Sequence, residues 1–222
     1  MRKSSLKFLK DLVTAPGPSG YEGPVRSVWT TEADRHADSV TVDVHGNAIA
    51  ALNAGGTPRI MLAGHMDELG FQILHISDAG FLHFDTIGGF DLGTISGRKV
   101  RVHTKGGPIL GVVGKKPIHL MKGDERKKVP EKHEMWIDIG ARNRDEALSR
   151  ISIGDVATYD HDFEPVAGST ITARAIDNKA GAYVVGETLI RLATAKVQRG
   201  LKSRVVSVAT AQAVRTENWS PP

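Results

Sequence analysis

The segment Gly64-His65-Met66-Asp67-Glu68 holds the side chains best suited to chemistry. It directly follows a continuous apolar run over residues 59–63, which is typical of a strand buried on both faces. Because alternate residues on a strand point to the same side, His65 and Asp67 can act together. Imidazole is a good zinc ligand, and a carboxylate on its other ring nitrogen fixes its orientation. The spacing indicates a metal site where ligands gather in open α/β sheets, at the carboxyl end of a strand.

The competing interpretation of this segment is structural, because a bare His-x-Asp triplet occurs by chance in many proteins. The pair would then be partly exposed and close a loop. A second candidate, Asp177, begins Asp177-Asn178-Lys179 ahead of a run with helical spacing. Aspartate is a favoured helix N-cap, and the sequence alone favours that structural role. An aspartate at a strand–helix junction can also face a cleft, so the two roles are compatible.

The composition excludes several classes of protein. The chain has 222 residues, of which 40% are hydrophobic and 24% charged, and its net charge is +4. No stretch approaches the roughly 20 apolar residues of a membrane span. The absence of cysteine excludes disulfides and thiolate metal sites. The N-terminus lacks the apolar core of a secretion signal, so we expect a cytoplasmic location and no membrane partner.

A polar, basic segment over residues 115–133 raises the question of nucleic-acid binding. Acidic residues are interspersed among its lysines, and neither aromatic stacking residues nor a known nucleic-acid motif accompanies them. We therefore expect a solvated loop or a subunit contact, and no nucleic-acid partner. Walker loops, Gly-x-Ser-x-Gly elbows and dinucleotide fingerprints are also absent from the sequence.

Two helices are predicted in the first forty residues. Ser19 and Glu22 have the spacing of a capping box, and Pro24 suits the first turn of the second helix. The first helix is predicted from apolar residues that share one stripe: Leu6, Leu9, Leu12 and Val13.

The rest of the chain is predicted to form strands, followed by a helix and a final strand. Valines at 40, 42 and 44 predict a half-buried strand, and residues 48–52 its partner. Short strands between glycine-rich turns then predict a small barrel or sandwich. A helix after Asp177 and a Val/Ala-rich strand over residues 204–211 follow. The predicted fold class is α/β, with residues 1–69 and 167–222 forming one domain and residues 70–166 an inserted β domain.

Eight short segments carry, in order, the motifs of one known family. They are Ala15–Glu22, Asp43–Asn47, Gly64–Phe71, Ile87–Gly89, Gly111–Gly114, Asp138–Ala141, Ile153–Asp155 and Ala175–Asn178. Together they resemble the tetrahedral (TET) aminopeptidases, which include glutamyl and deblocking aminopeptidases and relatives labelled cellulase or endoglucanase. The resemblance covers roughly residues 6–212, and the ordered set is far more specific than any one segment.

The resemblance implies a zinc-peptidase α/β domain of the aminopeptidase/phosphorylase-like kind, with a β-barrel inserted after the His-x-Asp strand. It implies two divalent metal ions, zinc or cobalt, in a complete active site. His65 matches the histidine ligand of one metal, Asp67 the active-site carboxylate that supports this histidine, and Asp177 the aspartate that bridges both metals. The implied reaction removes N-terminal residues from peptides, and the implied homo-oligomer is a dodecamer built from dimers.

The sequence departs from the family pattern after Gln212. The family continues with Glu-Glu, a proton-transferring base and then a metal ligand, whereas Ala-Val follows here. Read in another frame with suitable synonymous codons, residues 215–221 can become Gly-Leu-Arg-Thr-Gly-Ala-Arg, close to the family's next motif. We hypothesise a frameshift near Gln212, in the gene or in its sequencing, so that the C-terminal part of the α/β domain is missing. The nucleotide sequence tests it: the hypothesis fails if no one-base change opens a frame with Glu-Glu and a later histidine.

The predicted ligand set is consequently incomplete. Only His65 and Asp177 match ligands, and a hydrolytic zinc ion usually has three protein ligands and a water. We expect little or no peptidase activity from this chain, and an exposed apolar sheet edge that favours aggregation or dependence on a partner. The alternative function is a non-catalytic remnant or assembly subunit that binds an intact paralogue. Glycosidase activity is disfavoured, because Asp67 and Glu68 are adjacent and point to opposite strand faces.

Overall fold

The structure is a computed structural model that describes residues 1–194 and 199–213, except for the side chain of Glu125. These residues form two compact units. The sheet unit contains Met1–Glu68 and the described residues from Asp162 onward, and the barrel unit contains Leu69–His161. Residues 214–222, on which the frameshift hypothesis rests, lie outside the described residues. Within the described ranges, no helix has both the length and the apolar character needed to cross a membrane.

The sheet unit is built on a four-stranded mixed sheet in the order β1-β2-β12-β3. β1 pairs antiparallel with β2, β2 antiparallel with β12, and β12 parallel with β3. The strands are β1 (Ser39–Val42), β2 (Ala48–Leu52), β3 (Arg59–His65) and β12 (Arg204–Thr210). The strand pairing predicted between the valine-rich segment and residues 48–52 is therefore confirmed, although Val44 lies beyond the end of β1.

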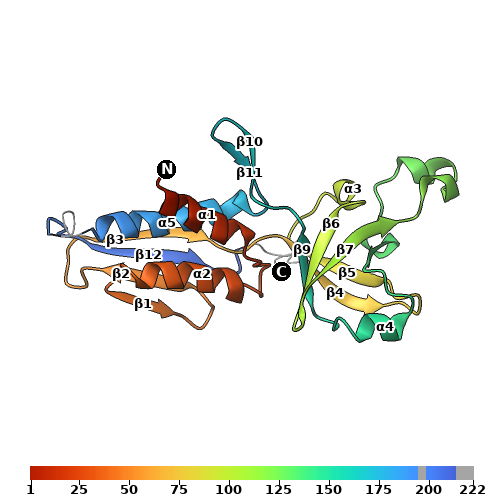
Figure 1. Cartoon of the computed structure of the whole chain (residues 1–222), viewed down its shortest axis with the longest axis horizontal. Helices are drawn as coiled ribbons and strands as arrows, with labels where there is room; N and C mark the ends of the chain where they lie inside the picture. The colour runs from red at the N-terminus through yellow and green to blue at the C-terminus, as the bar shows by residue number, and fades with distance from the viewer. Residues whose placement is uncertain (195–198, 214–222) are drawn as a thin grey trace, which may run out of the picture. The chain divides into compact units, whose positions relative to one another are not determined.

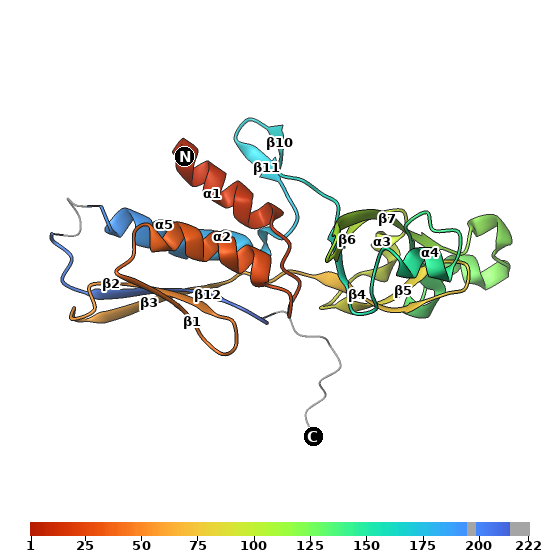
Figure 2. The same cartoon turned by 60° about the horizontal axis from the view of Figure 1, so that its bottom comes forward.

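Three helices cover one face of this sheet, as Figure 2 shows. They are α1 (Lys3–Thr14), α2 (Gly23–Asp34) and α5 (Ile176–Leu192). Trp29 of α2 is fully buried in the shared core, and its Nε1 donates to the carbonyl of Ala182 over 2.9 Å. The stripe predicted for α1 is partly wrong. Phe8 and Leu12 are buried, whereas Leu6 is exposed.

The predicted capping box before α2 is also wrong. The helix begins after Glu22 without any side-chain cap, and Pro24 does lie in its first turn. The hydroxyl of Ser19 donates instead to Asp67, which lies 48 residues further along the chain. The hydrogen bond of this hydroxyl to an ionised carboxylate is charge-assisted and therefore stronger than one between neutral groups.

The prediction that the apolar run of β3 is buried on both faces is wrong for the described residues. Met61 is 70% exposed and Ile60 is 43% exposed. In the part of the chain that the structure describes, β3 pairs only with β12 and forms an edge, and α1, α2 and α5 cover one face of the sheet and leave the other open. Both features expose side chains of β3. The expected exposed apolar edge is therefore present.

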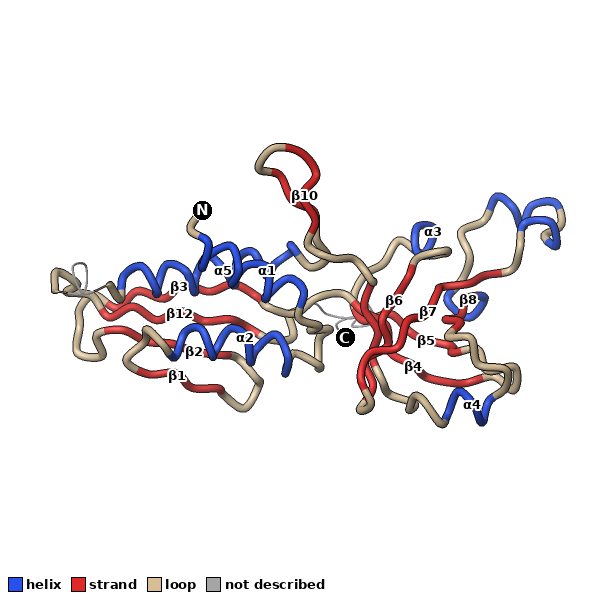
Figure 3. The backbone as a smooth tube through the Cα atoms, in the orientation of Figure 1, coloured by secondary structure: helices blue, strands red, loops and turns tan. Residues whose placement is uncertain are grey.

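A two-stranded antiparallel hairpin, β10 (Glu164–Ala167) with β11 (Thr170–Thr172), precedes α5 in the sheet unit. It projects from this unit as a separate ribbon in Figure 3. The side chains of β10 are all exposed. The hairpin therefore adds little to the core that α1, α2 and α5 share with the sheet.

The barrel unit is a closed six-stranded barrel in the order β4-β5-β8-β7-β6-β9, visible in Figure 1. The sequence left a barrel and a sandwich open, and the structure is a barrel. Its interior is packed with apolar side chains such as Phe71, Val102 and Ile137, so it encloses no channel. The strands are β4 (Gly70–Ile76), β5 (Leu82–Ile87), β6 (Lys99–Thr104), β7 (Gly107–Lys115), β8 (Met135–Asp138) and β9 (Val156–Tyr159).

Short helices complete the barrel unit. They are α3 (Leu92–Ile95), α4 (Arg144–Leu148) and three 3-10 turns, η1 (Ile118–Leu120), η2 (Gly123–Lys127) and η3 (Lys132–Glu134). The 3-10 turns occupy the basic segment that the sequence assigned to a loop, and most of its side chains are exposed. The α/β fold with a β-barrel between its two halves is thus confirmed.

Candidate active site

His65 lies between two carboxylates at the end of β3. Its Nδ1 is 3.1 Å from Oδ1 of Asp67, and its Nε2 is 3.3 Å from Oδ1 of Asp177. Asp67 is fully buried, the His65 side chain is 22% exposed, and the Asp177 side chain is 96% exposed. The contact of Nδ1 with the buried carboxylate fixes the ring, so that Nε2 faces Asp177. The imidazole is thereby oriented with its metal-binding nitrogen toward the accessible side.

Ser19 holds the second oxygen of Asp67. Its hydroxyl donates to Oδ2 over 2.5 Å, so both oxygens of this buried carboxylate accept hydrogen bonds. An ionised carboxylate needs such partners when it is removed from water. Sequence reasoning missed Ser19, because its spacing to Glu22 suggested a helix cap and no local pattern links it to residue 67.

The start of α5 places Asp177 beside His65. Ala175 has a positive φ of 59°, which non-glycine residues adopt rarely, and Asp177 and Asn178 have non-helical dihedrals. The regular helix therefore begins after them. Oδ1 of Asn178 accepts the backbone N–H of Gly181 over 3.0 Å, which is a capping interaction. The N-cap role that the sequence favoured for Asp177 is thus wrong, because Asn178 caps the helix and the Asp177 carboxylate lies against His65.

A close backbone approach brings these two segments together. A Cβ atom on Gly64 would lie 2.5 Å from the carbonyl carbon of Gly181 and 2.7 Å from the nitrogen of Ala182. Only a residue without a side chain fits between β3 and α5 at this point. Gly64 therefore sets the separation between the strand end that holds His65 and the helix start that holds Asp177.

Glu68 points away from Asp67 into a second buried cluster. Its carboxylate accepts hydrogen bonds from the backbone of Gly17 (2.9 Å), Nζ of Lys179 (2.6 Å) and Nε of Arg174 (3.1 Å). Lys179 is fully buried and also donates to the carbonyl of Ala15 over 2.7 Å. Burial lowers the pKa of the Lys179 ammonium, and the ion pair with Glu68 opposes this effect. The sequence did not indicate this cluster, whose members are far apart along the chain.

The donor atoms present fit a metal ion only in part. An imidazole nitrogen and a carboxylate oxygen are ligands that zinc and cobalt accept, and Nε2 of His65 and Oδ1 of Asp177 face each other. Over residues 1–194 and 199–213, however, no group of three or more His, Asp or Glu side chains could hold a metal. The described residues thus offer two ligands of an incomplete set.

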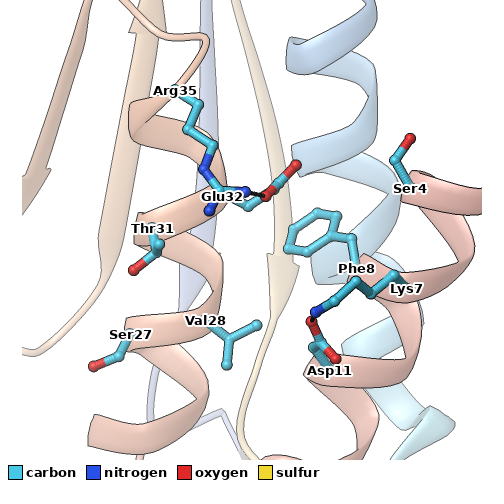
Figure 4. Close-up of a pocket in the computed structure, with 9 residues that line it drawn as sticks. All are labelled: Ser4, Lys7, Phe8, Asp11, Ser27, Val28, Thr31, Glu32 and Arg35. Atoms are coloured by element: carbon cyan, nitrogen blue, oxygen red, sulfur yellow. Dashed lines mark hydrogen bonds and ion pairs between the residues drawn. The ribbon is translucent and has the colours of Figure 1, made fainter.

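A separate groove of about 480 Å³ lies between α1 and α2 (Figure 4). Its charged side chains are paired with each other, Lys7 with Asp11 and Arg35 with Glu32. Phe8 and Val28 contribute the apolar part of its lining. No histidine lines the groove and its carboxylates are neutralised, so we assign the chemistry to the His65 site.

The comparisons with known proteins show the family of the chain. The model of the M42 glutamyl aminopeptidase family matches residues 46–213, which include His65, Asp67 and Asp177. The lysyl aminopeptidase of Pyrococcus furiosus is 30% identical over 190 residues, covering 84% of this chain and 54% of that protein.

Two solved structures resemble the whole described fold. The TET aminopeptidase of a marine sediment Thaumarchaeota archaeon is 33% identical with a TM-score of 0.88, covering 95% of this chain and 59% of that one. The TET1 peptidase of Pyrococcus horikoshii is 34% identical with a TM-score of 0.82, covering 93% and 61%. The present chain spans about half the length of the curated relatives it matches. On the family match and these similarities together, the chain belongs to the M42 glutamyl aminopeptidase family.

Proposed function

We propose that this chain is part of a metal-dependent aminopeptidase, a hydrolase that removes N-terminal residues from peptides. The observation that carries the proposal is the orientation of His65, whose imidazole is fixed by a buried Asp67 and faces Asp177. This is the arrangement expected of a histidine ligand and the carboxylate that supports it. Membership of the M42 family supports the reaction type.

In this proposal His65 and Asp177 hold metal, and Asp67 orients His65. A complete site would contain two divalent ions, zinc or cobalt, with further ligands beyond those in the described residues. Such ions supply Lewis-acid chemistry to peptide hydrolysis. The named relatives differ in the residue that they remove: the family model is named for glutamyl aminopeptidases, and one relative is a lysyl aminopeptidase.

Metal binding by the purified chain tests the site directly. We expect Co²⁺ alone to broaden the NMR signals of His65 selectively, because Nε2 and the Asp177 carboxylate can share an ion. His65→Gln identifies the His65 signals, and Asp177→Asn should remove their broadening. His75→Gln, which alters an exposed histidine of the barrel unit, should leave it unchanged. If Co²⁺ leaves His65 unaffected, or broadens all exposed histidines equally, the metal assignment is wrong.

Peptidase assays test the reaction. With aminoacyl-p-nitroanilides and added Zn²⁺ or Co²⁺, we expect the 222-residue chain to show little or no turnover, because the described residues supply only two ligands. Turnover near that of the Pyrococcus furiosus lysyl aminopeptidase would show that the site is complete and would contradict this expectation.

The second candidate function is that of an assembly subunit, either with copies of itself or with an intact paralogue. The observation that favours it is the exposed edge strand β3, with Met61 and Ile60 in contact with solvent. The TET1 peptidase of Pyrococcus horikoshii can assemble into a tetrahedron or a large octahedral shell, and we propose a homo-oligomer here as well. Native mass spectrometry of the chain mixed with an intact paralogue separates self-association from paralogue binding, because only a chain that binds the paralogue gives mixed complexes.

A further inference from the structure

Glu68 joins three segments that meet beneath the His65 site. It follows Asp67 directly, and its carboxylate binds the backbone of Gly17 in the turn after α1. It also binds Arg174 and Lys179, which lie on either side of Asp177 in the sequence. The Glu68 cluster consists of Glu68, Arg174 and Lys179. The cluster thus connects the end of β3 to the start of α5 at the point where each carries a side chain of the candidate site.

We propose that the Glu68 cluster consists of positioning residues, which set the distance between His65 and Asp177. The proposal rests on the proposed function, because it assigns the cluster a role in holding the metal-binding pair. None of its three side chains is a metal ligand in this proposal. Their role is to fix the backbone from which His65, Asp67 and Asp177 project.

The contacts leave the cluster little freedom. Lys179 is fully buried and bridges Glu68 and the carbonyl of Ala15, with distances of 2.6 and 2.7 Å. Arg174 donates to Glu68 over 3.1 Å and also to the carbonyl of Thr14. Both cations therefore bind the carboxylate and the backbone at the C-terminal end of α1 at the same time. Charge-assisted hydrogen bonds in a buried setting hold a geometry more tightly than surface pairs do.

The Glu68 cluster also determines where Asp177 lies. Lys179 is the first residue after the two non-helical positions Asp177 and Asn178, so it fixes where the regular part of α5 begins. Asp177 itself is 96% exposed and has little packing of its own. Its position therefore depends on its neighbours in the chain, and Lys179 and Arg174 are the neighbours tied to β3.

A variant of Lys179 tests the role, and the same helix offers a matched control. Lys179→Met removes the ammonium but leaves Glu68 paired with Arg174, so the chain should still fold. Glu187 is also buried on α5 and accepts hydrogen bonds from Arg2, Ser5 and Arg191. Glu187→Gln disturbs a comparable buried ion cluster on the same helix, away from β3. A purely structural effect would appear in both variants.

The measurement is the pair of ring ¹⁵N chemical shifts of His65 in the metal-free chain, from long-range ¹H–¹⁵N spectra assigned with His65→Gln. In Lys179→Met both shifts should differ from those of the unmodified chain, because the imidazole no longer lies at the same distances from Asp67 and Asp177. In Glu187→Gln they should not change. Addition of Co²⁺ alone should require roughly 10–100-fold more metal to broaden His65 in Lys179→Met, the usual loss when the support of a ligand is removed.

The outcomes separate this proposal from the proposed function. If Lys179→Met is folded and its His65 shifts equal those of the unmodified chain, the cluster is not a positioning device. If both variants move the His65 shifts equally, the effect is structural and the proposal is also overturned. If the shifts respond to Lys179→Met alone but Co²⁺ does not broaden the His65 signals, the positioning role stands and the metal function fails. Should Lys179→Met not fold, Arg174→Gln, which keeps the Lys179–Glu68 pair, gives the same readout.

Discussion

His65 is oriented by two carboxylates in very different surroundings. Asp67 is removed from solvent and holds Nδ1, whereas Asp177 is open to solvent and faces Nε2. A hydrogen bond in a water-excluded place is stronger and more directional than one at the surface. At the scale of single residues, Asp67 therefore fixes the imidazole. Asp177 is the carboxylate available to share a metal ion with Nε2 of His65.

Asp67→Asn tests this division of roles. The amide keeps the size of the side chain but changes the donor and acceptor pattern that His65 and Ser19 meet. We expect a redistribution of the His65 tautomers and a fall in Co²⁺ affinity on the order of 10–100-fold. Isothermal titration calorimetry measures the affinity. Asp124→Asn, on an exposed side chain of the barrel unit, is the control. Equal affinity in both variants would show that Asp67 does not support the site.

At the scale of elements, α5 holds the candidate site together. One end of the helix meets β3 through Gly64 and the Glu68 cluster. Further along, Glu187 binds Arg2 and Ser5 of the α1 segment and Arg191 of its own helix. The position of α5 relative to the sheet and to α1 is therefore fixed at separate points, and each can be disturbed without altering the other.

Gly64→Ala should separate β3 from α5. The new methyl group would lie 2.5 Å from a backbone carbon, and backbone cannot move aside as a flexible side chain can. We expect a loss of about 3 kcal/mol in the free energy of unfolding, the upper end of the usual range for overpacking. Urea denaturation measures it. Gly55→Ala, whose methyl group would meet nothing within 4 Å, should change stability by less than about 0.5 kcal/mol. Equal stabilities would contradict the close approach.

Glu187→Gln should weaken the contact between α1 and α5 in a pH-dependent way. Burial raises the pKa of Glu187, but hydrogen bonds from Arg191, Arg2 and Ser5 outweigh burial and lower the pKa below its ordinary value of 4.5. Because the folded-state pKa is depressed, the stabilisation is present above the unfolded pKa and is lost as the pH falls through the folded pKa. We expect a deficit of about 1 kcal/mol at pH 7, since both arginines are largely exposed.

Urea midpoints of the two proteins, measured from pH 7 down to pH 3, follow this deficit. It should stay constant down to about pH 5 and shrink below the ordinary glutamate pKa of 4.5. A deficit that does not change over this interval would mean that the Glu187 charge contributes nothing to stability.

At the scale of the whole molecule, we expect the edge strand β3 to govern association. In the part of the chain that the structure describes, the outer edge of β3 has no strand beside it, and its apolar side chains are exposed. Such an edge pairs readily with another chain. We expect the chain to form larger species as its concentration rises.

Replacement of Ile60 by Thr together with Met61 by Glu should reduce this association, because a charge on an edge strand opposes pairing. Light scattering coupled to size-exclusion chromatography measures the mass at several concentrations. Leu74→Glu removes a leucine of similar exposure from the barrel unit and should leave association unchanged. If the mass falls only with Leu74→Glu, the interface lies on the barrel unit.

The sequence by itself determined the order of the elements, the β character of the inserted segment and the candidacy of His65, Asp67 and Asp177. These features depend on local periodicity and on short motifs, which can be recognised without knowledge of the tertiary structure. The tertiary structure decided the rest. Ser19 and the Glu68 cluster reach their partners across 48 to 164 residues, so no spacing could indicate them. The exposure of β3 could not be predicted either, because the same apolar run can form a strand at the centre or at the edge of a sheet. Only the strand order distinguishes the two.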